Sequence, residues 1–481
     1  MGSEIRFLLN GSETRLSEVG GSDTLLDFLR LDRRMHGTKE GCAEGDCGAC
    51  TVLVGRLHEG ALRYEPVNAC IRFLASCHGC HIVTIEHLRG KDGGLHPVQQ
   101  AMVEQHGSQC GFCTPGFVMA LYGLWMQNPD PSVVEIETAL QGNLCRCTGY
   151  EPIVKAARAA AQAGGQAMDA LSLERDAVSA WLKAVAPARI EVARGDDRAI
   201  LPRDAADLAL VLAENPKATI VAGATDVGLW VTKMLKRISP AVFIGHLPDL
   251  KGISVTENEV TLGAGVTYSE FEPVIEEHFP QALDYWRRIA GWQVRNAGTI
   301  GGNIANGSPI GETPPLLIAL GAEVVLQNTA GMRTVALEDF FIEYGKQDRQ
   351  PGEFVAAIRI PRTGADRIAA YKVSKRQHSD ITATAAAFRV VTDGQVISDA
   401  RIAFGGMAGT PKRAERAEAA LRGKPFSRES FEAAAEAVGE DFQPLSDWRA
   451  TADYRRLVAA NLIRRFWLEQ TGEAHRLSRA Q

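Results

Sequence analysis

The stretch "EGCAEGDCGACTV", residues 40–52, places Cys42, Cys47 and Cys50 in a C-x4-C-x2-C pattern, and Cys70 follows further along the chain. This is the spacing of plant-type [2Fe–2S] clusters. A structural zinc site usually uses two short C-x2–4-C pairs instead. The spacing therefore favours an iron–sulfur cluster held by these four thiols.

Three glycines, Gly41, Gly45 and Gly48, alternate with the cysteines of this stretch. A loop that wraps a cluster needs positive φ angles and close backbone approach, which glycine permits. Such a loop also leaves amide N–H groups free to hydrogen-bond the sulfurs. The glycines therefore support the cluster assignment.

A second group of cysteines lies in "CGFCTPG", residues 110–116, and "NLCRCTGYEP", residues 143–152. Thr114 followed by Pro115 predicts an N-cap and a first helical residue, and Thr148 to Glu151 forms a capping-box pattern. Helix N-termini favour negative charge, and a thiolate-ligated cluster is anionic. On these residues alone, the four thiols suit either a cluster or zinc. They are Cys110, Cys113, Cys145 and Cys147.

All ten cysteines lie between Cys42 and Cys147, which in a reducing compartment favours metal binding over disulfides. Cys77 and Cys80 form a further C-x2-C, which we interpret as buried thiols without metal. The net charge of -6, without a basic tract, gives no indication of nucleic-acid binding. We see no signal peptide and no apolar run long enough to span a membrane. We therefore expect a cytoplasmic protein.

The length of 481 residues by itself suggests about three domains. Residues 1–90 alternate like strands around one helix, with a hairpin at Asn10-Gly11 and a helix "TLLDFLRLD" capped by Ser22 or Asp23. This is the β-grasp pattern. Residues 91–165 contain four short helical patterns, which predict a small bundle.

Residues 166–199 are rich in Ala, Asp and Gly and are expected to be a linker with some helix. Residues 200–363 are predicted to be an α/β domain in two parts, and residues 368–475 a C-terminal α+β domain. The predicted fold class is multidomain α+β.

Two elements of the α/β region are candidates for nucleotide binding. "IVAGATDVG", residues 220–228, is predicted to be a strand, a turn and a helix, and such turns can offer N–H groups to a diphosphate. "NAGTIGGNIANGSPIGETPP", residues 296–315, is predicted to begin with a long Gly/Asn loop, with four glycines between residues 298 and 307. The chain has no G-x-G-x-x-G in these elements, so a Rossmann nicotinamide site is not supported.

The paired motifs "EGCAEGDCGACTV" and "CGFCTPG…GNLCRCTGY" resemble the two [2Fe–2S] domains of the molybdenum hydroxylases, the xanthine dehydrogenase and aldehyde oxidase group. The two nucleotide elements resemble the FAD domain of the same family, which is of the vanillyl-alcohol-oxidase-like type. "ARIAFGGMAGTPKRAERAEAAL" looks like its C-terminal flavoprotein domain. The resemblance covers residues 4–163 and about 200–470.

The resemblance implies two [2Fe–2S] clusters, one on each set of four cysteines, and FAD. It also implies that Gln109 lies near a pterin held by a partner. Position 312 is commonly Asp in the family and is Glu here, and Ile289 replaces an aromatic residue of some members. A solvated surface lysine is the alternative interpretation of Lys372. The implied FAD contacts are Ile220, Val221, Ala222, Gly223, Ala224, Thr225, Asp226, Val227, Ile289, Thr299, Gly302, Asn303, Ser308, Glu312 and Lys372.

Nothing in the sequence resembles the molybdopterin-binding portion of the family, so we expect a separate molybdenum-binding large subunit, in a heterodimer or a dimer of heterodimers. The fusion of iron–sulfur and flavin domains favours the small subunit of a bacterial xanthine dehydrogenase. Electrons from hypoxanthine or xanthine, oxidised to urate, would pass through the second cysteine set, the first set and FAD to NAD+. Alternatives are a molybdenum hydroxylase for aldehydes or N-heterocycles, a free-standing NADH:acceptor reductase, and a non-redox protein with zinc in the bundle.

Overall fold

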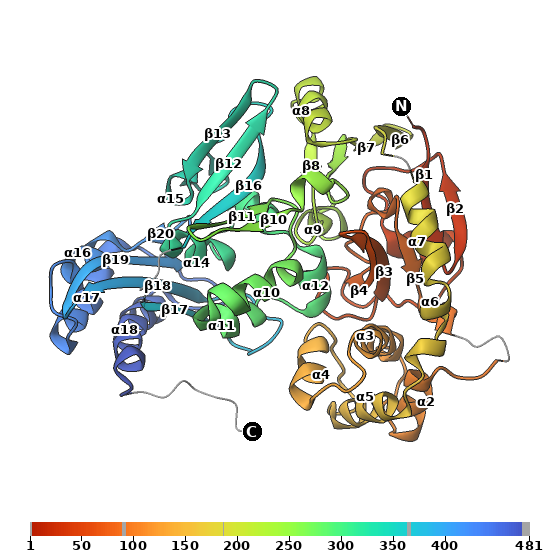
Figure 1. Cartoon of the computed structure of the whole chain (residues 1–481), viewed down its shortest axis with the longest axis horizontal. Helices are drawn as coiled ribbons and strands as arrows, with labels where there is room; N and C mark the ends of the chain where they lie inside the picture. Colours follow the sequence, from red (N-terminus) through yellow and green to blue (C-terminus); the bar gives the residue numbers. More distant parts are fainter. Residues whose placement is uncertain (1, 89–92, 186, 363–366, 474–481) are drawn as a thin grey trace. The chain divides into compact units, whose positions relative to one another are not determined.

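The computed structural model describes residues 2–88, 93–185, 187–362 and 367–473 (Figure 1). Within them the chain forms two compact units. The first holds the residues up to Pro248 together with Thr267–Ser269 and Ala290–Gly298. The second holds Asp249–Val266, Glu270–Ile289 and the residues from Thr299 onward. The predicted domain limits at 90/91, 363 and 475 lie outside the described residues.

The first unit begins with a five-stranded sheet in the order β2-β1-β5-β3-β4, in which β1 and β5 are parallel and the other pairs antiparallel. Asn10 and Gly11, at φ 50° and 81°, form the predicted hairpin turn. The predicted strand at 81–88 ends at Val83 and continues as a 3-10 turn, η3 (Ile85–Leu88). The strands are β1 (Ile5–Leu9), β2 (Ser12–Leu16), β3 (Thr51–His58), β4 (Ala61–Asn68) and β5 (His81–Val83).

The helix of this sheet domain consists of α1 (Leu25–Asp27), which continues as η1 (Phe28–Asp32). Its N-cap is Thr24, whose hydroxyl accepts a hydrogen bond from the Asp27 amide at 3.1 Å. The prediction of Ser22 or Asp23 at this position is therefore wrong. Asp23 instead accepts from the Gly20 amide at 2.8 Å, one turn earlier in the loop.

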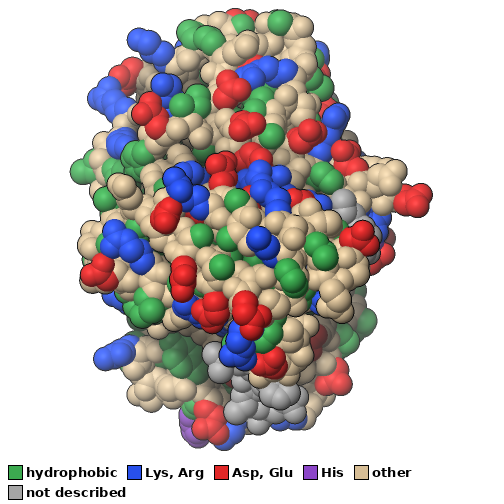
Figure 2. All heavy atoms as spheres, turned by 90° about the vertical axis from the view of Figure 1, so that its left-hand side faces the viewer, with side chains coloured by type: hydrophobic (Ala, Val, Ile, Leu, Met, Phe, Trp, Pro, Cys, Tyr) green, Lys and Arg blue, Asp and Glu red, His purple; other side chains and the backbone are tan. Residues whose placement is uncertain are grey.

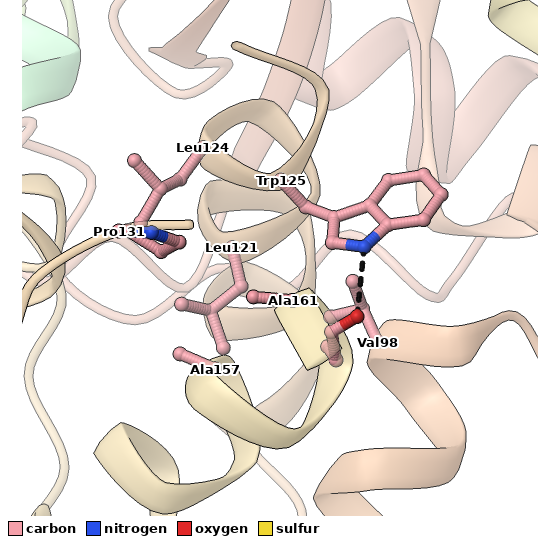
Figure 3. Close-up of a pocket in the computed structure, with 8 residues that line it drawn as sticks. Val98, Leu121, Leu124, Trp125, Pro131, Ala157 and Ala161 are labelled. Atoms are coloured by element: carbon pink, nitrogen blue, oxygen red, sulfur yellow. Dashed lines mark hydrogen bonds between the residues drawn. The ribbon is translucent and has the colours of Figure 1, made fainter. Parts of the chain in front are cut away.

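The next segment forms the predicted bundle of four helices, followed by the short helices η4 (Gln166–Met168), α6 (Ala170–Leu173) and α7 (Arg175–Ala184). The Trp125 indole donates to the Ala160 carbonyl at 3.0 Å beside a small apolar pocket that Leu121 and Pro131 help to line (Figure 3). This contact joins two helices of the bundle. The bundle helices are α2 (Pro97–Glu104), α3 (Thr114–Gln127), α4 (Val133–Ala139) and α5 (Glu151–Ala163).

The first unit also contains a four-stranded sheet in the order β6-β7-β9-β8, in which β9 is parallel to both of its neighbours. The strand–turn–helix predicted at 220–228 is present as β8 and α9. The elements are β6 (Ile190–Arg194), β7 (Asp197–Leu201), α8 (Ala205–Glu214), β8 (Thr219–Val221), α9 (Val227–Thr232), β9 (Ala241–Phe243) and α12 (Trp292–Ala297).

The second unit begins with an antiparallel five-stranded sheet in the order β10-β11-β16-β12-β13. The sequence predicts a loop at the start of residues 296–315, but most of these residues are helical. The Thr299 hydroxyl caps α13 by accepting a hydrogen bond from the Gly302 amide at 3.1 Å. This cap stabilises the helix although its first turn contains glycines.

These strands are β10 (Ile253–Val255), β11 (Glu259–Gly263), β12 (Glu323–Asn328), β13 (Gly331–Ala336) and β16 (Phe354–Pro361). The accompanying elements are η5 (Pro248–Leu250), α10 (Tyr268–His278), η6 (Pro280–Ala282), α11 (Leu283–Arg287), α13 (Ile300–Asn306), α14 (Thr313–Leu320), α15 (Leu337–Phe340), and the hairpin β14 (Phe341–Glu343) with β15 (Lys346–Gln347).

The C-terminal part of the second unit is an antiparallel sheet in the order β17-β18-β19-β20 with three helices. Its core includes Phe388, which stacks on Phe466 at a centroid distance of 5.0 Å. On the face in Figure 2, acidic and basic side chains are interspersed. The elements are β17 (Arg367–Val373), β18 (Thr384–Asp393), β19 (Val396–Gly405), β20 (Lys412–Arg413), α16 (Glu415–Leu421), α17 (Arg428–Asp441) and α18 (Ala452–Thr471).

Among the described residues, no helix combines the length and the apolar character needed to cross a membrane.

Candidate cofactor sites

The first four predicted ligands come together beside the five-stranded sheet. The Cys42 thiol hydrogen-bonds with the thiols of Cys47 and Cys70, and the Cys50 thiol with that of Cys70. Cys50 and Cys70 are buried, whereas Cys42 and Cys47 are partly exposed. The four thiols therefore line one space at the start of β3 and the end of β4.

The loop stabilises a thiolate at Cys42. Hydrogen bonds from the thiols of Cys47 and Cys70, followed by the backbone amides of Cys47 and Glu44, hold the pKa of Cys42 well below its ordinary value. The two amide nitrogens lie 3.3 Å and 3.4 Å from Cys42 Sγ. Backbone amides that donate to a ligand sulfur stabilise its thiolate, the form that ligates iron, so these two amide contacts fit a cluster.

Two glycines permit this loop. A Cβ at Gly41 would lie 2.8 Å from Cys47 Sγ, inside the space of the thiol. Gly48 has φ 70°, and a Cβ there would lie 2.2 Å from the Gly142 carbonyl oxygen. Any other residue at either position would displace the loop.

The second four predicted ligands form two thiol pairs at the start of α3 and before α5. Cys113 pairs with Cys145, and Cys110 pairs with Cys147. A [2Fe–2S] core takes four thiolates, two at each iron, which suits this pairing. Cys110 and Cys147 are exposed.

The helix starts differ from the predicted caps. The N-cap of α3 is Cys113 itself, so Thr114 is the first helical residue. The N-cap of α5 is Tyr150, at φ 71° and without a side-chain cap, so the predicted capping box is absent. Thr148 contacts the thiol instead, with its Oγ1 3.2 Å and its amide nitrogen 3.5 Å from Cys145 Sγ.

These contacts act on the Cys145 thiol. Burial raises its pKa, but the hydroxyl and amide hydrogen bonds of Thr148, together with those of the Cys147 amide and the Cys113 thiol, lower the pKa below its ordinary value. The residue predicted to cap a helix therefore stabilises a proposed ligand.

Gln109 is exposed and directly precedes the exposed Cys110. Cys77 and Cys80 are buried in the core of the first unit. Burial raises the pKa of Cys77 to about 11, which keeps it a neutral thiol. In the described part of the chain, no three His, Cys, Asp or Glu side chains are arranged to hold a single metal ion.

The first nucleotide element, Ile220 to Val227, consists of the end of β8, the turn that follows it and the first residue of α9. A Cβ at Gly223 would lie 1.8 Å from the Ala297 carbonyl oxygen, so the turn lies directly against the end of α12. Ala224 has φ 62°. The amides of Gly223, Ala224 and Thr225 donate no backbone or side-chain hydrogen bond to the described residues. Such free amides fit a diphosphate.

The second nucleotide element centres on α13, and its residues from Thr299 onward lie in the second unit. A Cβ at Gly301 would lie 2.4 Å from that of Ala264, so α13 packs directly on the neighbouring strand end. Asn303 Oδ1 is buried without a hydrogen-bond partner among the described residues. Ser308 Oγ accepts from the Ile310 amide at 3.4 Å. The unpaired Asn303 oxygen fits a polar ligand group.

Lys372 is buried rather than solvated. Its Nζ lies 2.7 Å from Glu312 Oε1 and donates to the Arg288 carbonyl at 2.7 Å. Glu312 also accepts a hydrogen bond from the Thr382 hydroxyl, and its carbonyl accepts from Tyr285. The surface interpretation of Lys372 is therefore wrong.

The second unit thus brings together the side chains of Glu312 and Lys372 and the carbonyl of Arg288, the residue before Ile289. Ile289 is buried, and the guanidinium of its neighbour Arg288 donates to the Lys372 carbonyl at 2.9 Å. Sequence reasoning missed Arg288, Tyr285 and Thr382, which hold this pair. No local pattern marks them, because their contacts join separate segments.

Four family models match consecutive parts of the chain. They are a 2Fe-2S iron-sulfur cluster binding domain (residues 7–86), a [2Fe-2S] binding domain (84–158), an FAD binding domain in molybdopterin dehydrogenase (195–363) and a CO dehydrogenase flavoprotein C-terminal domain (369–470). These matches confirm the predicted fold class and the prediction of two [2Fe–2S] clusters and FAD. They overturn the alternative of zinc in the bundle.

The chain is 32% identical to xanthine dehydrogenase of Drosophila subobscura over 97% of its own length, and it spans 39% of that relative. It is 29% identical to aldehyde oxidase 1 of Bos taurus over 97% of its length and 39% of the relative. The chain therefore spans about two fifths of the length of these relatives.

Two solved structures resemble parts of the chain. A carbon monoxide dehydrogenase chain from Hydrogenophaga pseudoflava is 30% identical, with a TM-score of 0.53, over 55% of this chain and 93% of that one. A chain of quinoline 2-oxidoreductase from Pseudomonas putida 86 is 28% identical, with a TM-score of 0.52, over 57% of this chain and 96% of that one. With two iron–sulfur domains followed by an FAD domain, the chain belongs to the molybdenum hydroxylase family and corresponds to its iron–sulfur and flavin portion.

Proposed function

We propose that the chain is the electron-transfer subunit of a xanthine dehydrogenase, in which hypoxanthine and xanthine are oxidised to urate. The observation that carries the proposal is the contact between the two cysteine loops: the Leu144 amide, next to Cys145, donates to the Cys47 carbonyl at 3.0 Å. Two cysteine loops in contact are suited to passing single electrons between the clusters that they would hold. The identity to xanthine dehydrogenases supports the substrate.

We propose the order second cysteine set, first cysteine set, flavin, then NAD+. A bound flavin takes up electrons singly and releases them as a hydride, which an iron–sulfur cluster does not do. The protein contributes the thiol pairs, the amides that stabilise thiolates, and the two nucleotide elements. The FAD contacts named from the sequence and the position of Gln109 near a partner's pterin are part of this proposal.

We also propose a molybdenum-binding partner subunit, with one heterodimer or a pair of them as the assembly. The exposed Cys110 and Cys147 support a route to a partner. The free state of all ten cysteines supports a cytoplasmic location. For the domains we propose 1–90, 91–165, 200–363 and 368–475, supported by the ranges of the family models. The linker predicted at 166–199 is corrected at its end, because residues 190–194 form β6 and β7 begins at Asp197, both in the four-stranded sheet.

The test is gentle purification of the chain from its native cell, followed by metal and flavin analysis and an assay with xanthine and NAD+. We expect a large partner with molybdenum, about four irons and one FAD per chain, and NADH formation. The same cofactors without xanthine turnover would move the substrate to an aldehyde or N-heterocycle, as the likeness to quinoline 2-oxidoreductase would suggest. Iron and flavin without molybdenum or partner would instead favour a free-standing NADH:acceptor reductase.

A further inference from the structure

Helix α12 carries three buried polar side chains that none of the proposed cofactor contacts includes. Gln293, Arg295 and Asn296 are each 1% exposed. Buried polar side chains need partners, because an unpaired donor or acceptor loses its hydrogen bonds to water. Each of the three makes at least one hydrogen bond to the iron–sulfur part of the first unit, whereas Gln293 Oε1 is buried without a partner among the described residues.

Gln293 contacts both cysteine loops at once. Its Nε2 donates to Asn143 Oδ1 at 2.7 Å and to Thr51 Oγ1 at 3.2 Å. Asn143 lies two residues before Cys145, and Thr51 directly follows Cys50. One amide group therefore joins a residue beside each proposed ligand set.

The two partners of Gln293, Asn143 and Thr51, both donate hydrogen bonds to a single backbone carbonyl. Asn143 Nδ2 donates to the Gly48 carbonyl at 3.2 Å, and Thr51 Oγ1 donates to the same carbonyl at 2.6 Å. Gly48 follows Cys47, whose carbonyl accepts from the Leu144 amide. The side chains bonded to Gln293 thus hold the place where the two loops meet.

Gly142, which faces Gln293, allows the Gln293 side chain to lie close to the loop backbone. A Cβ at Gly142 would lie 1.9 Å from Gln293 Oε1, so a larger residue would exclude the Gln293 side chain. The close approach requires glycine beside Asn143.

We propose that Gln293 is a positioning residue for electron transfer between the two proposed cluster sites. Its amide fixes the Asn143 and Thr51 side chains, which hold Gly48 and keep Cys47 and Leu144 in contact. The hydrogen bonds of Gln293 go to Thr51 and Asn143, residues beside the proposed ligands. The inference rests on the proposed function, because the loops are cluster loops only if their cysteines bind the clusters.

Asn296, on the same helix, supplies a matched control that separates a general loosening of α12 from loss of the Gln293 contacts. Asn296 is equally buried, and its Nδ2 donates to the Pro66 carbonyl on β4 at 2.9 Å. It also accepts from the Ser269 hydroxyl at 2.6 Å. Loss of the Asn296 amide weakens the attachment of α12 without removing a contact to either cysteine loop.

The experiment compares full-length Gln293→Met and Asn296→Leu, which remove an amide at nearly constant size, with the wild-type holoenzyme. Hydrogen exchange of the Leu144 amide is followed in the protein with its cofactors, by mass spectrometry of overlapping peptides. Electron paramagnetic resonance of the reduced protein reports the magnetic interaction between the two clusters.

We expect Gln293→Met to accelerate Leu144 exchange by about tenfold, the effect of losing one buried hydrogen bond, and to change the magnetic interaction. Asn296→Leu should leave both at the wild-type value. The proposal is overturned if Gln293→Met changes neither readout, or if Asn296→Leu changes them as much. If Gln293→Met does not fold, Gln293→Asn, whose shorter amide cannot reach both partners, takes its place.

Failure of the proposed function would look different. A wild-type protein without two distinct reduced cluster signals would contradict the ligand assignment. The exchange comparison at Leu144 would still decide whether Gln293 holds the two loops together.

Discussion

At the scale of single residues, the pair Lys372 and Glu312 is the clearest departure from what the sequence suggests. The Lys372 side chain is fully buried, and its charge is balanced by Glu312 Oε1 at 2.7 Å. Removing one member of a buried pair leaves the other charge without compensation. The pair therefore contributes to the integrity of the proposed flavin site, whatever its contact with the cofactor.

We predict that Lys372→Met lowers the free energy of unfolding of the second unit by about 3–5 kcal/mol and lowers FAD content. Urea denaturation and flavin analysis measure both quantities. Lys424→Met, at an exposed lysine of the same unit, should leave them unchanged. Equal effects of the two substitutions would show that the buried pair is not the cause.

His81 gives the first domain a pH dependence. It is fully buried, lies 2.8 Å from the Tyr64 hydroxyl through Nδ1, and accepts from the Gly11 amide through Nε2. Burial, with a smaller effect of His87, lowers the pKa of His81 to about 3. The unfolded chain takes up a proton near pH 6.5, whereas the folded chain does so only near pH 3.

Stability therefore falls as the pH falls through this window, by about 3 kcal/mol from His81 between pH 7 and pH 4. We predict that His81→Gln removes this part of the pH dependence. Hydrogen exchange of β5 amides, corrected for the chemical exchange rate, measures it. His36→Gln, at an exposed histidine, should keep the wild-type slope. An unchanged slope in His81→Gln would contradict the assignment.

At the scale of elements, α13 illustrates how a glycine-rich stretch becomes a helix. The Gly/Asn pattern of residues 296–315 predicts a loop because glycine and asparagine disfavour helices. The Thr299 cap and the contact of Gly301 with Ala264 overcome this preference. Gly301 permits a helix-to-strand distance that any side chain would increase.

We predict that Gly301→Ala destabilises the second unit by about 1–3 kcal/mol through overpacking, and reduces FAD binding. Gly439→Ala is the matched control, because Gly439 lies inside α17 and a Cβ added there would lie in open space. That substitution should stabilise by roughly 0.5–1 kcal/mol. Thermal unfolding and flavin content measure both, and equal signs would refute the packing argument.

At the scale of the whole molecule, the ten cysteines divide into two sets of four and one buried pair. In each set of four, the thiols of the proposed ligands lie next to one another. Cys77, in contrast, lies in an apolar core, where its pKa is raised. We predict that Cys50→Ser removes about two of four irons from the full chain, whereas Cys77→Ser removes none. Iron analysis and visible absorption measure this. Iron loss from Cys77→Ser would require a different ligand set.

The division into two units also departs from sequence order. Thr267–Ser269 and Ala290–Gly298 join the first unit, although both flanks of each segment belong to the second. Gln293 reaches Thr51 across a separation of 242 residues, a contact that no local pattern indicates.

The sequence by itself determined what depends on short spacings. It specified the two cysteine sets, the β-grasp hairpin at Asn10-Gly11, the helices of the bundle and the strand–turn–helix at residues 220–228. These features depend on the φ angles that residues allow, on hydrophobic periodicity and on the chemistry of closely spaced thiols.

Only the tertiary structure decided the burial of Lys372, the contact of Thr148 with Cys145, the helix at α13, and the joining of both cysteine loops by Gln293. In each case, two outcomes are compatible with the local sequence. The outcome depends on which distant side chain fills the space or supplies the hydrogen bond, because a buried polar group is stable only with a partner.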